Sequence, residues 1–277
     1  MRSRAAWAVT VGLAAVLGLA ATADVPVAAQ QPASPASQEV RTTPGAAPAP
    51  SADPPAAVCG SNSLDGPSEP PSGAIVVPTG SNASFDFTQP GVTYWFAPGV
   101  HTLGDGEFDQ IGPGSGSTFV GAPGAILHGR KINRYAFGGQ AADVTIRHLT
   151  VRGFVAPNNE GVVNHDSGDG WTIEHSTITA NRGAGMMAGS GQRVVGNCLK
   201  DNGQYGLNAY QAGNKIADVL VQGNEFAGNN TDDWESQISG CGCTGAMKFW
   251  SVDGADILDN WIHHNHGPGI WADTNNT

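Results

Sequence analysis

The chain has 277 residues, including 39 Gly and 18 Pro, with only 13% charged residues and a formal net charge of −11. Average proteins contain about 7% Gly and about 25% charged residues, so this composition disfavours a helical bundle or a coiled coil. The Gly residues have no three-residue period, which excludes collagen. Basic residues are few and scattered, which argues against a nucleic-acid partner because phosphate contacts need clustered Lys and Arg.

Residues 1–23 have the pattern of a secretory signal peptide. Arg2 and Arg4 precede an uncharged stretch, Ala5 to Ala23, that ends on the small-residue cleavage motif Ala21-Thr22-Ala23. The alternative is an uncleaved membrane anchor, since the stretch is nearly long enough to span a bilayer. We therefore expect a secreted protein, extracellular or at the cell surface, with no membrane segment after cleavage.

Residues 24–58 follow with a different composition, in which 18 of 35 residues are Ala or Pro. No aromatic and few branched apolar side chains are available there to offset the entropy of ordering, so we expect a disordered linker. The folded unit is then expected to begin near Cys59.

The second half of the chain repeats the pattern apolar-x-x-Asn-x-apolar around Asn197, Asn224 and Asn260, with Leu149 and Ser176 at the same place in two earlier copies. The marked positions recur after 27, 21, 27 and 36 residues. Short strands between Gly and Asn turns at this spacing predict a solenoid of stacked parallel strands rather than a sandwich of hairpins. We expect the repeated Asn to adopt a left-handed φ at tight turns and to form a ladder with a spacing of about 4.8 Å.

This pattern resembles the right-handed parallel β-helix superfamily, whose enzymes include pectate-lyase-like and alginate-epimerase-like proteins. The fold class it implies is an all-β, right-handed parallel β-helix solenoid. Residues 59–140 would form an N-terminal cap and the first coils, and residues 141–277 the repeat coils. Because the sequence stops at Asn275-Asn276-Thr277, where another coil should begin, we expect it to be truncated at its C-terminus.

Alternation along the second strand of each coil predicts which side chains point outward. One outward row is expected to contain Val163, Met187, Asn208, Lys248 and Trp271, and the row beside it His165, Gly189, Tyr210, Trp250 and Asp273. Aromatic faces with adjacent polar groups suit a sugar chain, so the predicted partner is a polysaccharide, bound by a monomer.

The number of carboxylates expected on this face restricts the types of reaction that it could catalyse. Hydrolysis of a glycoside needs a pair of carboxyl groups, whereas only Asp273 is expected among the outward residues. A lyase acting on uronate polymers by β-elimination instead needs a base and hydrogen-bond donors. We therefore assign candidate catalytic roles to Lys248, Tyr210 and His165, and substrate-binding roles to Asn208, Trp250, Trp271 and Asp273. The alternative is a noncatalytic carbohydrate-binding or cell-surface structural module.

An epimerase is disfavoured because the segment Tyr205-Gly206-Leu207-Asn208-Ala209-Tyr210 lacks the Asp, Pro and His of the Tyr-Gly-x-Asp-Pro-His motif of alginate epimerases.

Metal binding has weaker support in the sequence. His263, His264 and His266 could contribute ligands, but consecutive strand residues face opposite sides, so we expect exposed histidines at a turn and assign no metal residues. Calcium remains the one candidate cofactor, at Asp232, Asp233 and Glu235 or near Asp166 and Asp169, although no motif defines such a site.

Four cysteines in an exported chain can form disulfides. We expect Cys198 to pair with Cys241 or Cys243, because the excursion that carries those two could fold back over its coil. Cys59 is not placed by this reasoning. The alignment of the repeats also predicts that His148 stacks on His175, and Arg147 on Glu174, in adjacent coils.

Overall fold

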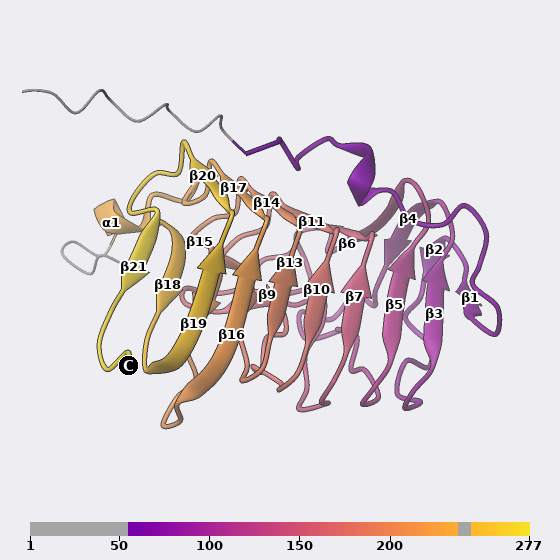
Figure 1. Cartoon of the computed structure of the whole chain (residues 1–277). Helices are drawn as coiled ribbons and strands as arrows, with labels where there is room; N and C mark the ends of the chain where they lie inside the picture. Colours follow the sequence, from indigo (N-terminus) through magenta and orange to yellow (C-terminus); the bar gives the residue numbers. More distant parts are fainter. Residues whose placement is uncertain (1–54, 238–244) are drawn as a thin grey trace, which may run out of the picture. The chain divides into compact units, whose positions relative to one another are not determined.

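The chain winds repeatedly through three parallel sheets, so that each strand pairs with its counterparts in the preceding and following coils (Figure 1). The computed structural model describes residues 55–237 and 245–277, which belong to a compact unit spanning Ala52–Thr277. The predicted signal peptide, residues 24–54 of the predicted linker, and Cys241 and Cys243 lie outside the described residues.

Two sheets of eight strands run side by side along the solenoid, and a third sheet of five strands begins later in the chain. The first sheet contains β1 (Ile75–Val77), β3 (Thr93–Phe96), β5 (Thr118–Gly121), β7 (Thr145–Arg147), β10 (Thr172–Glu174), β13 (Arg193–Val195), β16 (Ile216–Gln222) and β19 (Val252–Leu258). The second contains β2 (Gly80–Ser81), β4 (Gly99–Thr102), β6 (Ala125–His128), β8 (Thr150–Arg152), β11 (Thr177–Thr179), β14 (Cys198–Lys200), β17 (Glu225–Ala227) and β20 (Trp261–His263). The third contains β9 (Gly161–Val163), β12 (Ala184–Met187), β15 (Tyr205–Ala209), β18 (Gly245–Phe249) and β21 (Ile270–Ala272).

Helices are short in the described part of the chain, where a 3-10 helix spans Asn62–Leu64 and α1 spans Trp234–Gln237. None of the helices described there has the length and apolar character to cross a membrane.

The predicted asparagine ladder is confirmed at the corner between the first and second sheets. Asn224 Nδ2 donates to Asn260 Oδ1 at 2.9 Å, and Asn197 Nδ2 donates to Asn224 Oδ1 at 3.0 Å. Ser176 continues the series, because its backbone N–H donates to Asn197 Oδ1. Each rung thus satisfies backbone and side-chain groups that would otherwise be buried without partners.

A second ladder, which the repeat analysis did not foresee, follows the strands of the second sheet. It runs through Asn181, Asn202, Asn229 and Asn265, with Nδ2 to Oδ1 distances of 2.8 to 3.1 Å. The two ladders hold the two corners of the later coils at fixed spacing.

The expected left-handed φ at the ladder Asn is wrong, because the residue before each rung adopts it instead. Gly196, Gly223 and Asp259 have φ of 63°, 63° and 53° immediately before Asn197, Asn224 and Asn260. The chain therefore turns at the residue before each ladder Asn. The side-chain amide of the Asn itself then lies along the solenoid axis.

The interior is apolar and follows the repeat. Ile146, Ile173, Val194 and Val221 are buried and align across β7, β10, β13 and β16. On the coil surface, the predicted stacking of His148 on His175 is confirmed by a centroid separation of 5.6 Å, and Arg147 lies 3.9 Å from Glu174. The fold class predicted from the sequence is therefore the observed one.

The expected cysteine pairing is wrong, because Cys198 forms its disulfide with Cys59. The segment before the first strand, drawn in indigo in Figure 1, lies against β14 and β17, which belong to two successive coils. There the backbone N–H groups of Val58 and Cys59 donate to Glu225 Oε2 at 2.8 and 2.9 Å. This contact joins residues far apart in sequence, so it leaves no trace in the repeat pattern.

Candidate functional site

Lys248 on β18 is the central charged residue of the candidate site. Its ammonium lies 3.1 Å from Asp273 Oδ2, and the two side chains are 9% and 18% exposed. The same nitrogen lies 4.4 Å from the ring centre of Trp271 and 5.2 Å from that of Trp250. A carboxylate and two indole faces all attract a positively charged ammonium group.

The predicted outward row through Lys248 is confirmed by the strand register. Met187 pairs with Asn208, Asn208 with Lys248, and Lys248 with Trp271, across β12, β15, β18 and β21. Ala209 and Phe249, the residues between the two outward rows, are buried in the core as expected. The repeat therefore delivers these side chains to one face of the third sheet.

Tyr210 and Trp250 form the aromatic part of this face. Their ring centroids lie 5.9 Å apart in an edge-to-face arrangement, and each residue is 37% exposed. Because each ring is only partly covered, both present apolar surface to solvent.

A cavity of about 200 Å³ opens beside this pair and is lined by Asn159, Asn208, Tyr210, Lys248 and Trp250. Asn208 donates from Nδ2 to the backbone carbonyl of Asn159 at 3.0 Å. Its Oδ1 is buried and has no hydrogen-bond partner among the residues that the structure describes. The cavity is thus lined by an amide whose buried oxygen lacks a hydrogen-bond partner.

The wall formed by Asn159 depends on a loop that crosses a neighbouring coil. Asn159 exchanges hydrogen bonds with Gln204 at 2.7 and 3.0 Å, two coils along the solenoid. Gly183 lies beneath, where a side-chain carbon would come within 3 Å of the carbonyl oxygens of Ala156, Pro157 and Glu160. A glycine is therefore required at this close approach.

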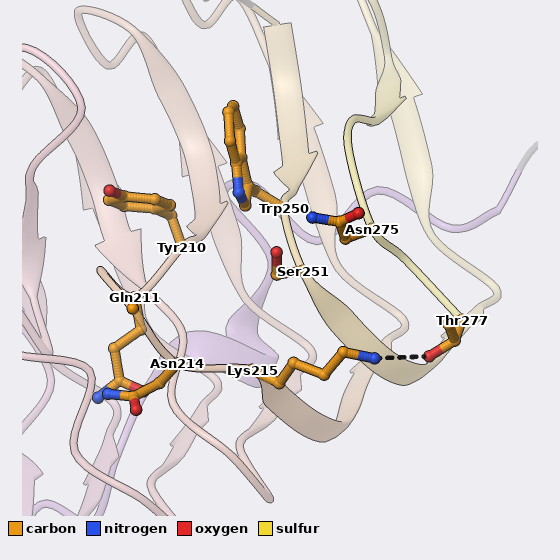
Figure 2. Close-up of a pocket in the computed structure, with 9 residues that line it drawn as sticks. Tyr210, Gln211, Asn214, Lys215, Trp250, Ser251, Asn275 and Thr277 are labelled. Atoms are coloured by element: carbon orange, nitrogen blue, oxygen red, sulfur yellow. Dashed lines mark hydrogen bonds between the residues drawn. The ribbon is translucent and has the colours of Figure 1, made fainter.

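A second cavity, of about 500 Å³, shares Tyr210 and Trp250 with the first (Figure 2). Tyr210 and Trp250 line it together with Gly213 and the polar residues Gln211, Asn214, Lys215, Ser251, Asn275 and Thr277. We call the surface made by both cavities and the Tyr210–Trp250 pair the aromatic groove.

His165 is placed differently from the alignment that predicted its position. Val163 pairs with Met186 rather than with Met187, so the predicted alignment of β9 is wrong by one residue. Beyond β9 the chain takes left-handed φ values at Asn164 and Ser167, of 51° and 54°, and the turn is wider than in later coils.

The His165 ring stacks on Tyr135 with centroids 3.5 Å apart, and Nε2 lies 3.8 Å from Asp166 Oδ1. The coils of β12 and β15 separate it from Lys248, so three coil steps give a separation of about 14 Å. The structure thus gathers Asn208, Tyr210, Lys248, Trp250, Trp271 and Asp273, and it places His165 in a different group of side chains.

Two buried tyrosines have altered acidity. Burial, with a smaller contribution from the Asp273 carboxylate, raises the pKa of Tyr205, whose hydroxyl has no partner among the described residues. Burial also raises the pKa of Tyr135, which donates a hydrogen bond to Glu160. Both phenols therefore stay neutral at physiological pH.

Within the described residues, no cluster of three His, Cys, Asp or Glu side chains is arranged to hold a metal ion. Of the histidines considered in the sequence, His263 contacts Glu225 Oε1 at 3.2 Å and His264 Nδ1 at 2.7 Å.

Residues 160–277 match the family model described as the right handed beta helix region, a segment that extends from the residue before β9 to Thr277, five residues beyond β21. Together with the three stacked parallel sheets, this match identifies the fold as a right-handed parallel β-helix. Comparisons with curated proteins and with solved structures gave no match.

Proposed function

We propose that this β-helix protein binds a polysaccharide chain in the aromatic groove. The observation that carries this proposal is that Tyr210 and Trp250, each 37% exposed, line both cavities. Sugar rings present apolar faces and polar edges, and aromatic faces next to amide groups complement both. Because two cavities share this pair, the ligand can extend beyond one sugar.

The size and polarity of the smaller cavity support a sugar unit as its occupant. Its volume of about 200 Å³ is below the 300–1,000 Å³ typical of pockets for drug-sized ligands. The unpaired Oδ1 of Asn208 accepts hydrogen bonds, and Lys248 donates them. Such a combination suits a hydroxyl-rich ring.

Lyase-type β-elimination on a uronate polymer is the second candidate function. The observation that favours it is that three of the residues given roles in the reaction, Asn208, Tyr210 and Lys248, line one cavity. Lys248 would have to take the proton next to the sugar carboxylate, while a donor protonates the leaving oxygen. The ammonium contacts with Asp273, Trp250 and Trp271 support a binding role for Lys248 more than that of a base.

We also infer that the protein is secreted and meets its polysaccharide outside the cell. Two observations support this inference: the signal-like residues 1–23 and the Cys59–Cys198 disulfide. Disulfides persist in oxidising compartments such as the extracellular space.

Electrophoresis in native gels containing polysaccharides tests the proposed function. Wild-type protein should be retarded by at least one polymer in a panel of neutral and acidic chains, and Trp250→Ala should lose most of that retardation. Phe108→Ala, which removes a 59% exposed ring far along the chain, is the matched control and should behave like the wild type. Absence of retardation by every polymer, or equal loss in both variants, would refute binding in the groove.

The lyase candidate has a separate readout. Incubation with uronate polymers, with and without calcium, would generate the ultraviolet absorbance of unsaturated products if β-elimination takes place. Retardation without such absorbance leaves binding as the function and removes the lyase.

A further inference from the structure

The larger cavity of the aromatic groove differs in charge from the smaller one. In the smaller cavity, Lys248 is paired with Asp273, so that its charge is already compensated. In the larger cavity, Lys215 is the one charged residue among nine that line it, and no carboxylate side chain is among them.

Lys215 also differs from most basic residues of this acidic protein. Of the ten Lys and Arg residues in the described part of the chain, six form ion pairs with Asp or Glu. Within the same part, Lys215 forms none, and its ammonium donates to the Thr277 hydroxyl at 3.4 Å (Figure 2). That hydroxyl in turn donates to Asp253 Oδ1 at 2.8 Å, so the nearby carboxylate is engaged by Thr277.

The residues around Lys215 supply further donors. Gln211 and Asn214 lie on the same turn between β15 and β16, and Ser251 and Asn275 complete the polar side of the cavity. An ammonium group, amide N–H groups and a hydroxyl, in a cavity that no carboxylate side chain lines, are suited to bind an anionic oxygen group.

We propose that the larger cavity is a subsite for the anionic group of an acidic polysaccharide, with Lys215 as its charged ligand-binding residue. The inference rests on the proposed binding of a polysaccharide over Tyr210 and Trp250 and specifies its class. A carboxylate of a uronic acid and a sulfate ester both provide the required oxygen atoms. One sugar ring is held in the smaller cavity, and the neighbouring sugar ring carries the carboxylate or sulfate that Lys215 binds.

The test compares two pairs of polymers that differ in charge. Polygalacturonate is compared with its fully methyl-esterified form, and dextran sulfate with dextran, by the retardation of the full chain in native gels. Lys215→Gln should weaken retardation by the acidic polymer about threefold, the effect expected for an exposed charge pair, and should leave retardation by the neutral polymer unchanged. Lys215→Arg should retain binding. Lys131→Gln, which removes the charge of another exposed lysine, should behave like the wild type.

The outcomes separate this inference from the proposed function. If Trp250→Ala loses binding while Lys215→Gln binds both polymers like the wild type, the anionic subsite is refuted and the groove stands. If Lys215→Gln weakens acidic and neutral polymers equally, the subsite is likewise refuted. If the wild type binds none of the four polymers but is retarded by another member of the panel, the anionic subsite is refuted and the proposed function stands. If no polymer of the panel retards it, both are refuted. An effect confined to one pair identifies the group as a carboxylate or a sulfate.

Discussion

Lys248 Nζ and Asp273 Oδ2 lie 3.1 Å apart on the outer face of the third sheet, each on its own coil. Both side chains are largely removed from water, with the ammonium also facing Trp250 and Trp271. The pair links β18 to the residue that follows β21, and Lys248 lines the smaller cavity, so the pair has a structural role whatever the ligand is.

Removing one partner of this pair should destabilise the protein. Lys248→Met leaves the Asp273 carboxylate without its cation, and we expect the free energy of unfolding to fall by about 2 kcal/mol, measured by denaturant titration. Adding Asp273→Asn to that variant should recover part of the loss, because the uncompensated charge disappears. Strictly additive effects of the two substitutions would show that they do not interact.

Substitutions in the first asparagine ladder should lower the free energy of unfolding more than substitutions of exposed asparagines. Asn224→Ala removes the acceptor for the Asn197 N–H and the donor to the Val194 carbonyl, both buried. We expect a loss of about 2–4 kcal/mol in the free energy of unfolding, since two buried groups lose their partners. The exposed Asn214→Ala serves as the control and should change stability by less than about 0.5 kcal/mol. Similar values for both variants would contradict a stabilising ladder.

The disulfide between Cys59 and Cys198 closes a loop with a sequence separation of 139 residues. Replacing Cys59 by Ser in the full chain should lower stability by about 2–5 kcal/mol, because the unfolded chain regains the freedom of that loop. Reduction of the wild type should reproduce the effect at equilibrium in denaturant. An unchanged unfolding midpoint in both experiments would show that the covalent link contributes nothing.

Stability should fall in mild acid through His128. Burial, with smaller contributions from Arg152 and Arg130, lowers the pKa of His128, and its Nδ1 accepts the Arg130 N–H at 2.8 Å. The unfolded chain therefore binds this proton more readily than the folded one, and the contribution is lost as pH falls below about 6.5. His128→Asn is the control variant. Its side-chain oxygen can still accept the hydrogen bond from the Arg130 N–H, but the Asn side chain does not titrate.

Urea unfolding between pH 5 and pH 8 measures this contribution. The wild type should lose stability towards pH 5, and His128→Asn should lose less. The difference between the two proteins would be absent if His128 took up its proton equally in both states.

The repeat made most of the fold predictable. Asn197, Asn224 and Asn260 recur with the coil, and the same periodicity placed Asn208, Lys248 and Trp271 in one row. The period fails where the chain departs from the coil, as at the wide turn after β9 that moved His165.

Other parts of the site depend on contacts that no repeat encodes. Asn159 reaches Asn208 by crossing Gly183, and Lys215 lies at a turn of the long connection after β15. The Cys59–Cys198 contact is likewise a single long-range event. Sequence periodicity therefore located the face, whereas the walls of the cavities required the structure.

A crystal structure of the full chain with an oligosaccharide taken from a polymer that retards it would show directly whether the aromatic groove binds the polysaccharide. We expect a sugar ring in contact with Trp250 and Tyr210, with the sugar chain extending into both cavities. A ligand bound on another face, with the surface between Asn208 and Lys215 free, would contradict it.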